Sequence, residues 1–266
     1  MARILITGSA GGIGQMTARV LLEEGHSVVL HARNGERAKE AHEALPDAEA
    51  VLVADLRSIS ETRSMAESAN KLGSFDAIIH NAGAMPLTQS ISSDGISELF
   101  SVNVLAPYIL TAMMERVERF IYIGSGAHRA SSAHFNDLQW TTRQWNRNDA
   151  YAESKLYGVL LTFAVPRFLP NVLANAVSPG WVATRMGGKN ATDDLKESPR
   201  TQAWLAVSNS SAAKVSGGYF FHFEQGSANE IAYQTDIQDR LLAECRRVSG
   251  ISFPASPGAI SFSKEA

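Results

Sequence analysis

The sequence has one cysteine, no long basic run and no apolar stretch near the ~18 residues that indicate a membrane-spanning helix. A single thiol, Cys245, excludes an intrachain disulfide and a cysteine-based metal site. The formal net charge is −3, and the densest basic stretch is ECRRVSG near the C-terminus. Nucleic-acid binding needs clustered lysine and arginine, so this class of function is disfavoured. The N-terminal MARILITG lacks the layout of a signal peptide. We therefore expect a soluble, cytoplasmic protein with no nucleic-acid partner and no membrane span.

What the chain does have is a series of short apolar runs separated by amphipathic stretches. The runs are RILITG, HSVVLHAR, AVLVAD, FDAIIHNAG, RFIYIGS and VLANAVSPG. They are rich in Val, Ile and Leu without polar alternation, which is typical of strands buried on both faces. The stretches GQMTARVLLEEG and SETRSMAESANKLG have helical spacing and end at Gly25 and Gly73. The pattern predicts an α/β fold: a single-domain, Rossmann-type, doubly wound parallel sheet with helices on both faces.

The whole chain, 1–266, is expected to form one domain, because it shows no internal repeat and no low-complexity linker. Residues 186–216 are polar and irregularly spaced, and we interpret them as a substrate-loop excursion of that domain. Residues 250–266 are rich in proline and serine and are expected to form an extended tail.

The first apolar run leads into the glycine-rich stretch TGSAGGIG, Thr7 to Gly14. Glycines at positions 8, 12 and 14 allow a tight turn and a close approach of the backbone to a pyrophosphate. The helix that follows presents free N–H groups and the positive end of its dipole to that anion. A glycine-rich turn between a strand and a helix predicts a dinucleotide site.

The stretch DAYAESKLYG places Tyr151 and Lys155 four residues apart, so that they are neighbours on one helical face. Taken alone, this spacing also fits an ordinary surface pair. Other motifs decide between the two interpretations. TGSAGGIG resembles the TGxxxGxG motif of the short-chain dehydrogenase/reductase superfamily, and HNAG at residues 80–83 resembles its NNAG motif.

The resemblance extends from Thr7 to Thr184, about two-thirds of the chain. It implies a catalytic tetrad of Asn103, Ser125, Tyr151 and Lys155. It also implies a nicotinamide cofactor held by Gly8, Gly12, Ile13, Gly14, Arg33, Asp55, Leu56, Asn81, Ala82, Gly83, Tyr151, Lys155, Pro179, Val182 and Thr184. Asp55 resembles the aspartate that accepts from the adenine amino group, although a turn-capping aspartate would look the same. His80 replaces an asparagine and is interpreted as a packing residue, and no metal site is expected.

The cofactor is predicted to be NADP(H) in preference to NAD(H). The second apolar run ends in LHARN, with Ala32 and Arg33 where a carboxylate would bind the ribose hydroxyls of NAD. A cation there suits a 2′-phosphate. A surface arginine is the alternative, and the second basic residue that many NADP-preferring relatives carry is missing at Ser9 and Ala10.

The tetrad that the resemblance implies would reduce a ketone or aldehyde, or oxidise the corresponding alcohol. A free tyrosine has a pKa near ~10. A neighbouring ammonium, together with the positive oxidised nicotinamide, is expected to lower that value for Tyr151, which favours general acid–base catalysis. Ser125 would stabilise developing alkoxide charge, and Asn103 resembles the residue that fixes a water for proton resupply. A catalytically silent NADP(H)-binding redox sensor and a sugar epimerase or dehydratase are the alternatives. The resemblance also allows a homodimer or homotetramer.

The interval from Ser125 to Tyr151 spans 26 positions, and its spelling resembles the retinol-dehydrogenase-like and ketoreductase-like branch. Phe135, Trp140 and Trp145 within it, with Trp181, either wall an apolar pocket for a bulky substrate or pack this insert onto the domain. The stretch MGGKNATDDLKES after Thr184 is either a lid over the substrate or a solvated loop.

Overall fold

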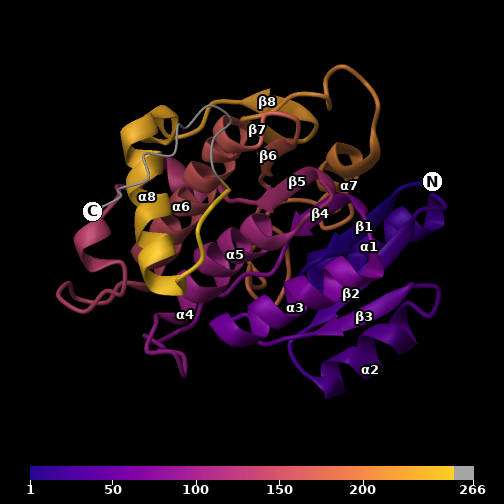
Figure 1. The fold of residues 1–266 in the computed structure, drawn as a ribbon, viewed down its shortest axis with the longest axis horizontal. Helices are drawn as coiled ribbons and strands as arrows, with labels where there is room; N and C mark the ends of the chain where they lie inside the picture. Colours follow the sequence, from indigo (N-terminus) through magenta and orange to yellow (C-terminus); the bar gives the residue numbers. More distant parts are fainter. Residues whose placement is uncertain (255–266) are drawn as a thin grey trace, which may run out of the picture.

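A single eight-stranded sheet runs through the molecule in the computed structural model, which describes residues 1–254 (Figure 1). The strand order is β3-β2-β1-β4-β5-β6-β7-β8, and every neighbouring pair is parallel except β7 and β8. The strands are β1 (Arg3–Ile6), β2 (Ser27–Ala32), β3 (Ala50–Val53), β4 (Phe75–His80), β5 (Val117–Ile123), β6 (Leu173–Val177), β7 (Gly218–Phe221) and β8 (Glu224–Gly226). The fold class expected from the sequence is confirmed. The six apolar runs are β1 to β6, and the short β7 and β8 were not predicted.

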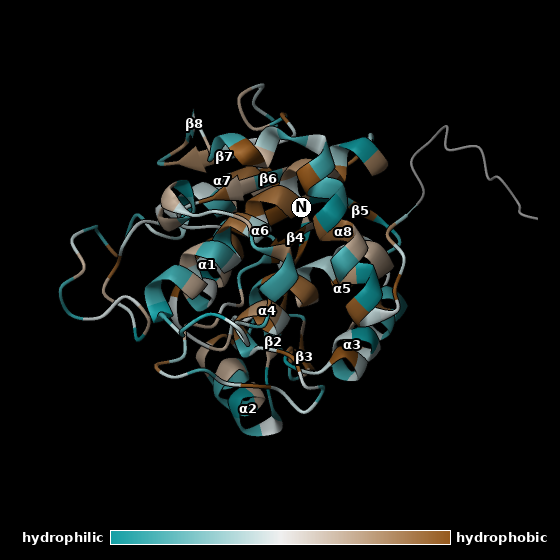
Figure 2. Cartoon of the chain, turned by 90° about the vertical axis from the view of Figure 1, so that its left-hand side faces the viewer, coloured by the Kyte–Doolittle hydropathy of each residue, from teal (hydrophilic) through white to brown (hydrophobic). Residues whose placement is uncertain are grey.

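Helices cover both faces of this sheet. They are α1 (Gly12–Glu23), α2 (Gly35–Ala44), α3 (Ile59–Leu72), α4 (Glu98–Phe100), α5 (Ala106–Met113), α6 (Arg147–Phe168), α7 (Arg200–Val207) and α8 (Thr235–Ser249). One apolar core joins the sheet to α3, α5, α6 and α8, and a second joins its other face to α1, α2 and α7. Figure 2 shows brown, apolar residues at the centre and teal residues on the outer sides of the helices. This is the layering that buries a parallel sheet.

The C-terminal helix α8 packs along α6, the helix that carries Tyr151 (Figure 1). Just beyond it, the carbonyl of Ile251 accepts a hydrogen bond of 2.7 Å from the Tyr108 hydroxyl on α5, and the Phe253 ring packs against Tyr108. The chain's own C-terminal segment therefore covers much of the outer side of α5 and α6. From residue 255 onward, the expected extended tail lies outside the described residues.

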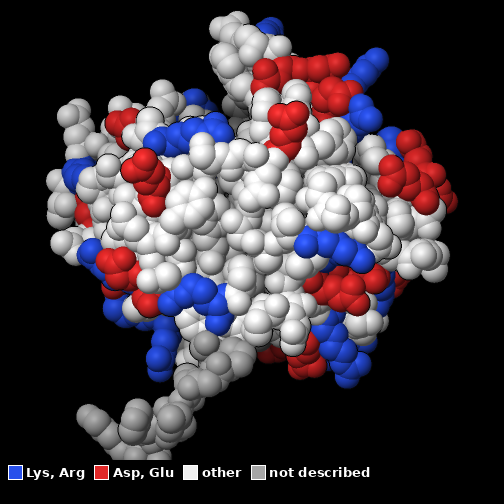
Figure 3. All heavy atoms as spheres, turned by 90° about the horizontal axis from the view of Figure 1, so that it is seen from above, with Lys and Arg blue, Asp and Glu red and all other residues white. Residues whose placement is uncertain are grey.

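The segment predicted as an excursion, 186–216, contains helix α7, which packs against β4 and β5 and beside α1. Only the residues before α7 lie over the carboxyl ends of the strands. Among residues 1–254, no helix combines the length and the hydropathy needed to cross a membrane. On the face drawn in Figure 3, acidic and basic side chains are interspersed around a largely uncharged centre. A surface of mixed sign offers no continuous basic track for nucleic acid.

Candidate active site

A cavity of about 1300 Å³ opens beyond the carboxyl ends of the strands, where β1 has β2 on one side and β4 on the other. This reversal of strand order is where doubly wound sheets bind their ligands. Every site residue proposed from the sequence lines this cavity except Gly14 and Asn103, which lie behind its wall. The volume exceeds the ~300–1,000 Å³ of a common ligand pocket. It is therefore large enough for a dinucleotide together with a substrate.

At Gly8 and Gly14 the glycine turn is so closely packed that a Cβ atom has no space. Gly8 has a φ of +65°, and a Cβ atom there would lie 2.8 Å from the Cα of Ala82. A Cβ on Gly14 would lie 2.3 Å from Nδ2 of Asn81, which donates hydrogen bonds to the carbonyls of Thr7 and Gly8. The close contact between Gly14 and Asn81 therefore shapes the turn.

Sequence reasoning missed His31, which supports the same turn. Its Nδ1 accepts a hydrogen bond of 2.8 Å from the N–H of Gly8, so its Nε2 carries the proton that is shared with the carbonyl of Ala54 at 2.9 Å. Burial lowers the pKa of His31, opposed by the hydrogen bond to Ala54. The imidazole is therefore held neutral, in the tautomer that the Gly8 hydrogen bond requires.

The N-terminus of α1 is the feature that best fits an anion. Gly11 caps this helix with no side-chain hydrogen bond, whereas Asn34, Ser58 and Asn146 cap α2, α3 and α6 with their side chains. Around Gly12 a Cβ would meet nothing within 4 Å. The first turn of α1 thus presents N–H groups and a positive dipole end to open cavity. These residues fit a dinucleotide pyrophosphate.

Two arginines face the cavity beside this turn. Arg33 is exposed at the end of β2 and has no ion pair among residues 1–254. Arg37, which sequence reasoning missed, donates from Nη2 to the carbonyl of Ala10 at 2.6 Å and pairs with Glu40. Helix α2 therefore places a second arginine beside the glycine turn, paired with Glu40. The sequence feature that could have indicated Arg37 is Asn34, which caps α2 and brings its first turn next to Arg33.

Asp55 lines the cavity, but its carboxylate is bound by a neighbour. Nε of Arg57 donates at 3.0 Å to both carboxylate oxygens, and this guanidinium holds the pKa of Asp55 below its ordinary value. The carboxylate expected to meet an adenine amino group thus positions Arg57 at the cavity wall. Arg57 is therefore a third arginine in the cavity lining, with Arg33 and Arg37.

Ser125 and Tyr151 meet in the cavity beyond β5. Burial raises the pKa of Tyr151, and a hydrogen bond with Ser125 acts in the opposite direction. The sequence predicted that the ammonium and an oxidised nicotinamide together lower this pKa. Among the protein groups alone, burial of the phenol dominates. The Lys155 ammonium lies 5.6 Å from the centre of the Tyr151 ring, as a cation over the aromatic face. The phenol is therefore held in its proton-donating form.

Lys155 is buried and donates one hydrogen bond of 2.8 Å from Nζ to the carbonyl of Ile123. Burial lowers its pKa to about 8. The ammonium is thus a charged group held in a site that disfavours charge, one helical turn from Tyr151.

Asn103 lies in a π-helical turn, Ser101–Leu105, between α4 and α5, where the sequence predicted continuous helix. Its side chain accepts from the N–H of Ala84 at 2.7 Å and donates to the carbonyl of Ala84 at 3.0 Å and to the Ser154 hydroxyl at 2.9 Å. π-turns of this kind occur frequently at functional sites. Asn103 also lines a second cavity, of about 10 Å³, together with Lys155 and His80.

His80 packs in the core as expected, with its ring against Phe120 and Tyr122. Burial lowers its pKa to about 3. No group of three potential metal ligands exists among residues 1–254.

Of the four aromatic residues considered for a substrate wall, only Trp181 lines the large cavity. Phe135 packs in the main core against Tyr157, and Trp140 packs edge-on against Trp145. The insert's aromatics therefore pack it onto the domain, the second of the two interpretations. Other large apolar or aromatic side chains that line the cavity are Met85, Val102, Met186, Tyr219 and Phe221.

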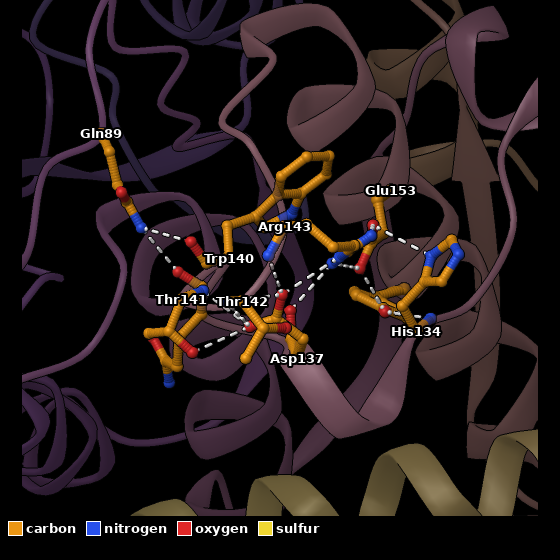
Figure 4. A network of polar contacts seen from close by, with 10 residues as sticks. Gln89, His134, Asp137, Trp140, Thr141, Thr142, Arg143 and Glu153 are labelled. Carbon is orange, nitrogen blue, oxygen red and sulfur yellow. Dashed lines mark hydrogen bonds and ion pairs between the residues drawn. The ribbon is translucent and has the colours of Figure 1, made fainter.

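The insert between Ser125 and Tyr151 is fastened to α6 by a buried network (Figure 4). The Asp137 carboxylate accepts from the N–H groups of Thr141, Thr142 and Arg143. Burial alone would raise the pKa of Asp137, but these hydrogen bonds and the Arg143 guanidinium hold it well below the ordinary range. Arg143 also donates at 2.8 Å to Glu153 on α6, two residues after Tyr151. The network thus ties the insert to α6, the helix that carries Tyr151 and Lys155.

Thr184 lies in a turn at the opposite wall of the cavity. Its hydroxyl accepts from the N–H of Gly187 at 3.1 Å, and the indole of Trp181 donates to the carbonyl of Gly187 at 2.9 Å. Asp193 accepts from the N–H of Trp181 at 2.7 Å. The segment after β6 is therefore an internally hydrogen-bonded loop at the cavity mouth.

Comparison with known proteins agrees with this geometry. Residues 2–136 match the family model for short chain dehydrogenases. An uncharacterised oxidoreductase of Emericella nidulans is 43% identical over 260 residues, covering 96% of this chain and 99% of its own. Human retinol dehydrogenase 13 is 30% identical over 286 residues, covering 95% of this chain and 86% of its own. The fold matches an uncharacterised Mycobacterium paratuberculosis protein with a TM-score of 0.82, at 24% identity over 96% of this chain and 95% of that one. The chain therefore belongs to the short-chain dehydrogenase/reductase superfamily, in its retinol-dehydrogenase-like branch, as an oxidoreductase that uses a nicotinamide cofactor.

Proposed function

We propose that this protein is an NADP(H)-dependent carbonyl reductase, or the corresponding alcohol dehydrogenase, in which Tyr151 is the general acid and base. The observation that carries the proposal is the meeting of Ser125, Tyr151 and Lys155 at one end of a cavity whose other end is an uncapped glycine turn. When bound, the reduced nicotinamide supplies a hydride to the carbonyl carbon. Tyr151 donates its proton to the carbonyl oxygen, so that the product is the alcohol.

The other residues prepare this proton transfer. The Ser125 hydroxyl, which opposes the rise in the pKa of Tyr151, would donate to the substrate oxygen as negative charge develops there. Lys155 places its positive charge over the Tyr151 ring and favours the phenolate left after transfer. The cavity of about 10 Å³ beside Lys155 and Asn103 is of the size of one water molecule. Such a water would return the proton from solvent.

The preference for NADP(H) is supported by the positive charge at the adenosine end. Arg33 and Arg37 face the cavity there, and no acidic side chain ends β2. Replacing Arg33 by Asp should lower kcat/KM with NADPH by about 10-fold to 100-fold, the loss of one or two charge-assisted hydrogen bonds, and change NADH use far less. Lys39→Asp, on the exposed side of α2, makes the same charge change outside the cavity. Equal losses with both cofactors would contradict the assignment.

The reaction is tested by the absorbance of the reduced nicotinamide in the presence of aromatic and aliphatic ketones and aldehydes. Wild type should consume NADPH in a substrate-dependent way, and Tyr151→Phe should lower kcat by at least about 100-fold, the range assigned to general acid catalysis, without weakening NADPH binding. Tyr233→Phe, outside the cavity, is the matched control. If wild type binds NADPH yet turns over nothing in the panel, the site is a cofactor-binding sensor instead.

A further inference from the structure

Two arginines at the substrate end of the cavity, Arg129 and Arg147, have no acidic partner among residues 1–254. By contrast, the cavity arginines at the adenosine end include two that pair with carboxylates, Arg37 with Glu40 and Arg57 with Asp55. A guanidinium remains charged at every physiological pH. The substrate end is therefore left with uncompensated positive charge.

Arg147 is aligned with the catalytic pair on α6. It is the first residue of the helix, four before Tyr151 and eight before Lys155, so the three share one face and Arg147 lies one turn, about 6 Å, beyond Tyr151. Its Nε and Nη2 donate to the carbonyl of Met85 at 3.3 and 3.1 Å. These bonds fix the guanidinium plane and leave its Nη1 available to a ligand.

Arg129 lies four residues after Ser125 and is fixed in the same way. Its Nε and Nη2 both donate at 3.2 Å to the carbonyl of Ser227, and its guanidinium lies 5.0 Å from the centre of the Tyr219 ring. A Cβ placed on Gly126, the residue after Ser125, would lie 3.7 Å from Nη1. The free edge of Arg129 is therefore next to the backbone that carries the catalytic serine.

The acidic residues that line the cavity do not neutralise these two groups. Asp55 is bound by Arg57, and Glu98 acts electrostatically on Arg57 as well. Asp193 accepts from the backbone of Trp181. Arg129 contacts β7 and the segment after β8, on the side of β5 away from the glycine turn, so it stands outside the part of the cavity that fits the cofactor.

We infer that the substrate is an oxo acid or hydroxy acid whose carboxylate binds Arg147, with Arg129 flanking it, while its carbonyl lies against Ser125 and Tyr151. This rests on the proposed reductase function and deepens it. A carboxylate is the partner that the fork of a guanidinium matches best. The apolar lining by Met85, Val102 and Met186 fits an aromatic or aliphatic body between the two ends.

The test compares 4-acetylbenzoate with its methyl ester, which has the same ketone and no charge. Wild type with NADPH should reduce the acid with a kcat/KM at least about 10-fold higher, because a charge-assisted hydrogen bond is lost with the ester. Arg147→Met should lower kcat/KM for the acid by about 10-fold to 100-fold and leave the ester within about 3-fold. Arg129→Met should act in the same direction, and Arg63→Met, exposed on α3, should affect neither compound.

Equal use of acid and ester by wild type, or an equal loss for both in Arg147→Met, would overturn the inference while leaving the reductase function intact. If neither compound is reduced, calorimetric titration of 4-acetylbenzoate into the protein with NADPH decides the question. Saturable binding that is weakened by Arg147→Met but not by Arg63→Met would support the carboxylate site. In that case only the reductase function would be contradicted. If 4-acetylbenzoate does not bind, or binds equally well to Arg147→Met and wild type, the proposed carboxylate site is wrong.

Discussion

Replacing Lys155 by methionine should make the cofactor-free protein more stable at pH 7 while it abolishes turnover. The reason is that Lys155 is buried with one hydrogen bond, to the carbonyl of Ile123, and its pKa falls from 10.5 to about 8. At about 1.4 kcal/mol for each pH unit, that difference is a cost of about 3 kcal/mol to the folded protein at pH 7. Methionine has a similar length and carries no charge.

Part of the gain is lost again, because the carbonyl of Ile123 loses its donor, which costs about 1 kcal/mol. The expected net gain is about 2 kcal/mol in the free energy of unfolding at pH 7. The sign of the pH dependence follows from the lowered pKa. Above about pH 8 the folded protein binds fewer protons at this site than the unfolded chain does, so the wild type gains stability as the pH rises toward 10.5 and the gap to the variant closes.

Urea denaturation of both proteins, followed by circular dichroism at about pH 7 and about pH 10, measures this gap as a difference. Buried groups such as Cys245, whose pKa burial raises, titrate equally in both proteins and cancel. Lys71→Met, exposed on α3, is the matched control and should leave the free energy of unfolding within about 0.5 kcal/mol. A variant that is less stable than wild type at pH 7, or a gap that stays constant with pH, would refute the reasoning.

Three further outcomes are expected. Gly14→Ala should weaken NADPH binding, measured by fluorescence titration, by at least about 10-fold, since its Cβ atom would lie 2.3 Å from Nδ2 of Asn81 and displace it. Gly35→Ala is the control, because a Cβ atom there would meet nothing within 4 Å. Equal effects of the two variants would contradict the steric argument. Arg143→Met should cost on the order of 3 kcal/mol at pH 7, because Asp137 and Glu153 are buried carboxylates that lose their guanidinium partner. Because the pKa of Asp137 is depressed, that loss should shrink as the pH falls below about 4, and a pH-independent loss in urea denaturation would argue against it. Sedimentation velocity should show a monomer, since α8 covers α6; a stable dimer would mean that another face associates.

The local motifs of the cofactor half were readable from the sequence, because each depends on residues close together in the chain. The turn TGSAGGIG needs glycine where φ is positive or where backbones meet, and the strand before it and the helix after it have their own periodicity. Continuous apolar runs predicted the six buried strands. β7 (GYFF) contains no Val, Ile or Leu and β8 (EQG) is polar, so neither carries the signal that marked the other six strands.

The tertiary structure decided which charges and rings face the cavity. Arg37 reaches the glycine turn from the next helix, and Arg129 and Arg147 are brought to one cavity from the ends of two different elements. The insert's aromatics, which could have faced either way, turn into the core because Asp137 and Arg143 fasten their segment to α6. Such outcomes depend on long-range packing, which spacing along the chain does not record.

The sequence by itself thus determined the six buried strands and the glycine turn, since these follow from local periodicity and from a motif of fixed spacing. The resemblance to a known family added the candidate catalytic residues. Only the folded chain decided the protonation of the site. Burial raises the pKa of Tyr151 and lowers that of Lys155, and burial is a property of everything packed around a group and not of its neighbours in the chain.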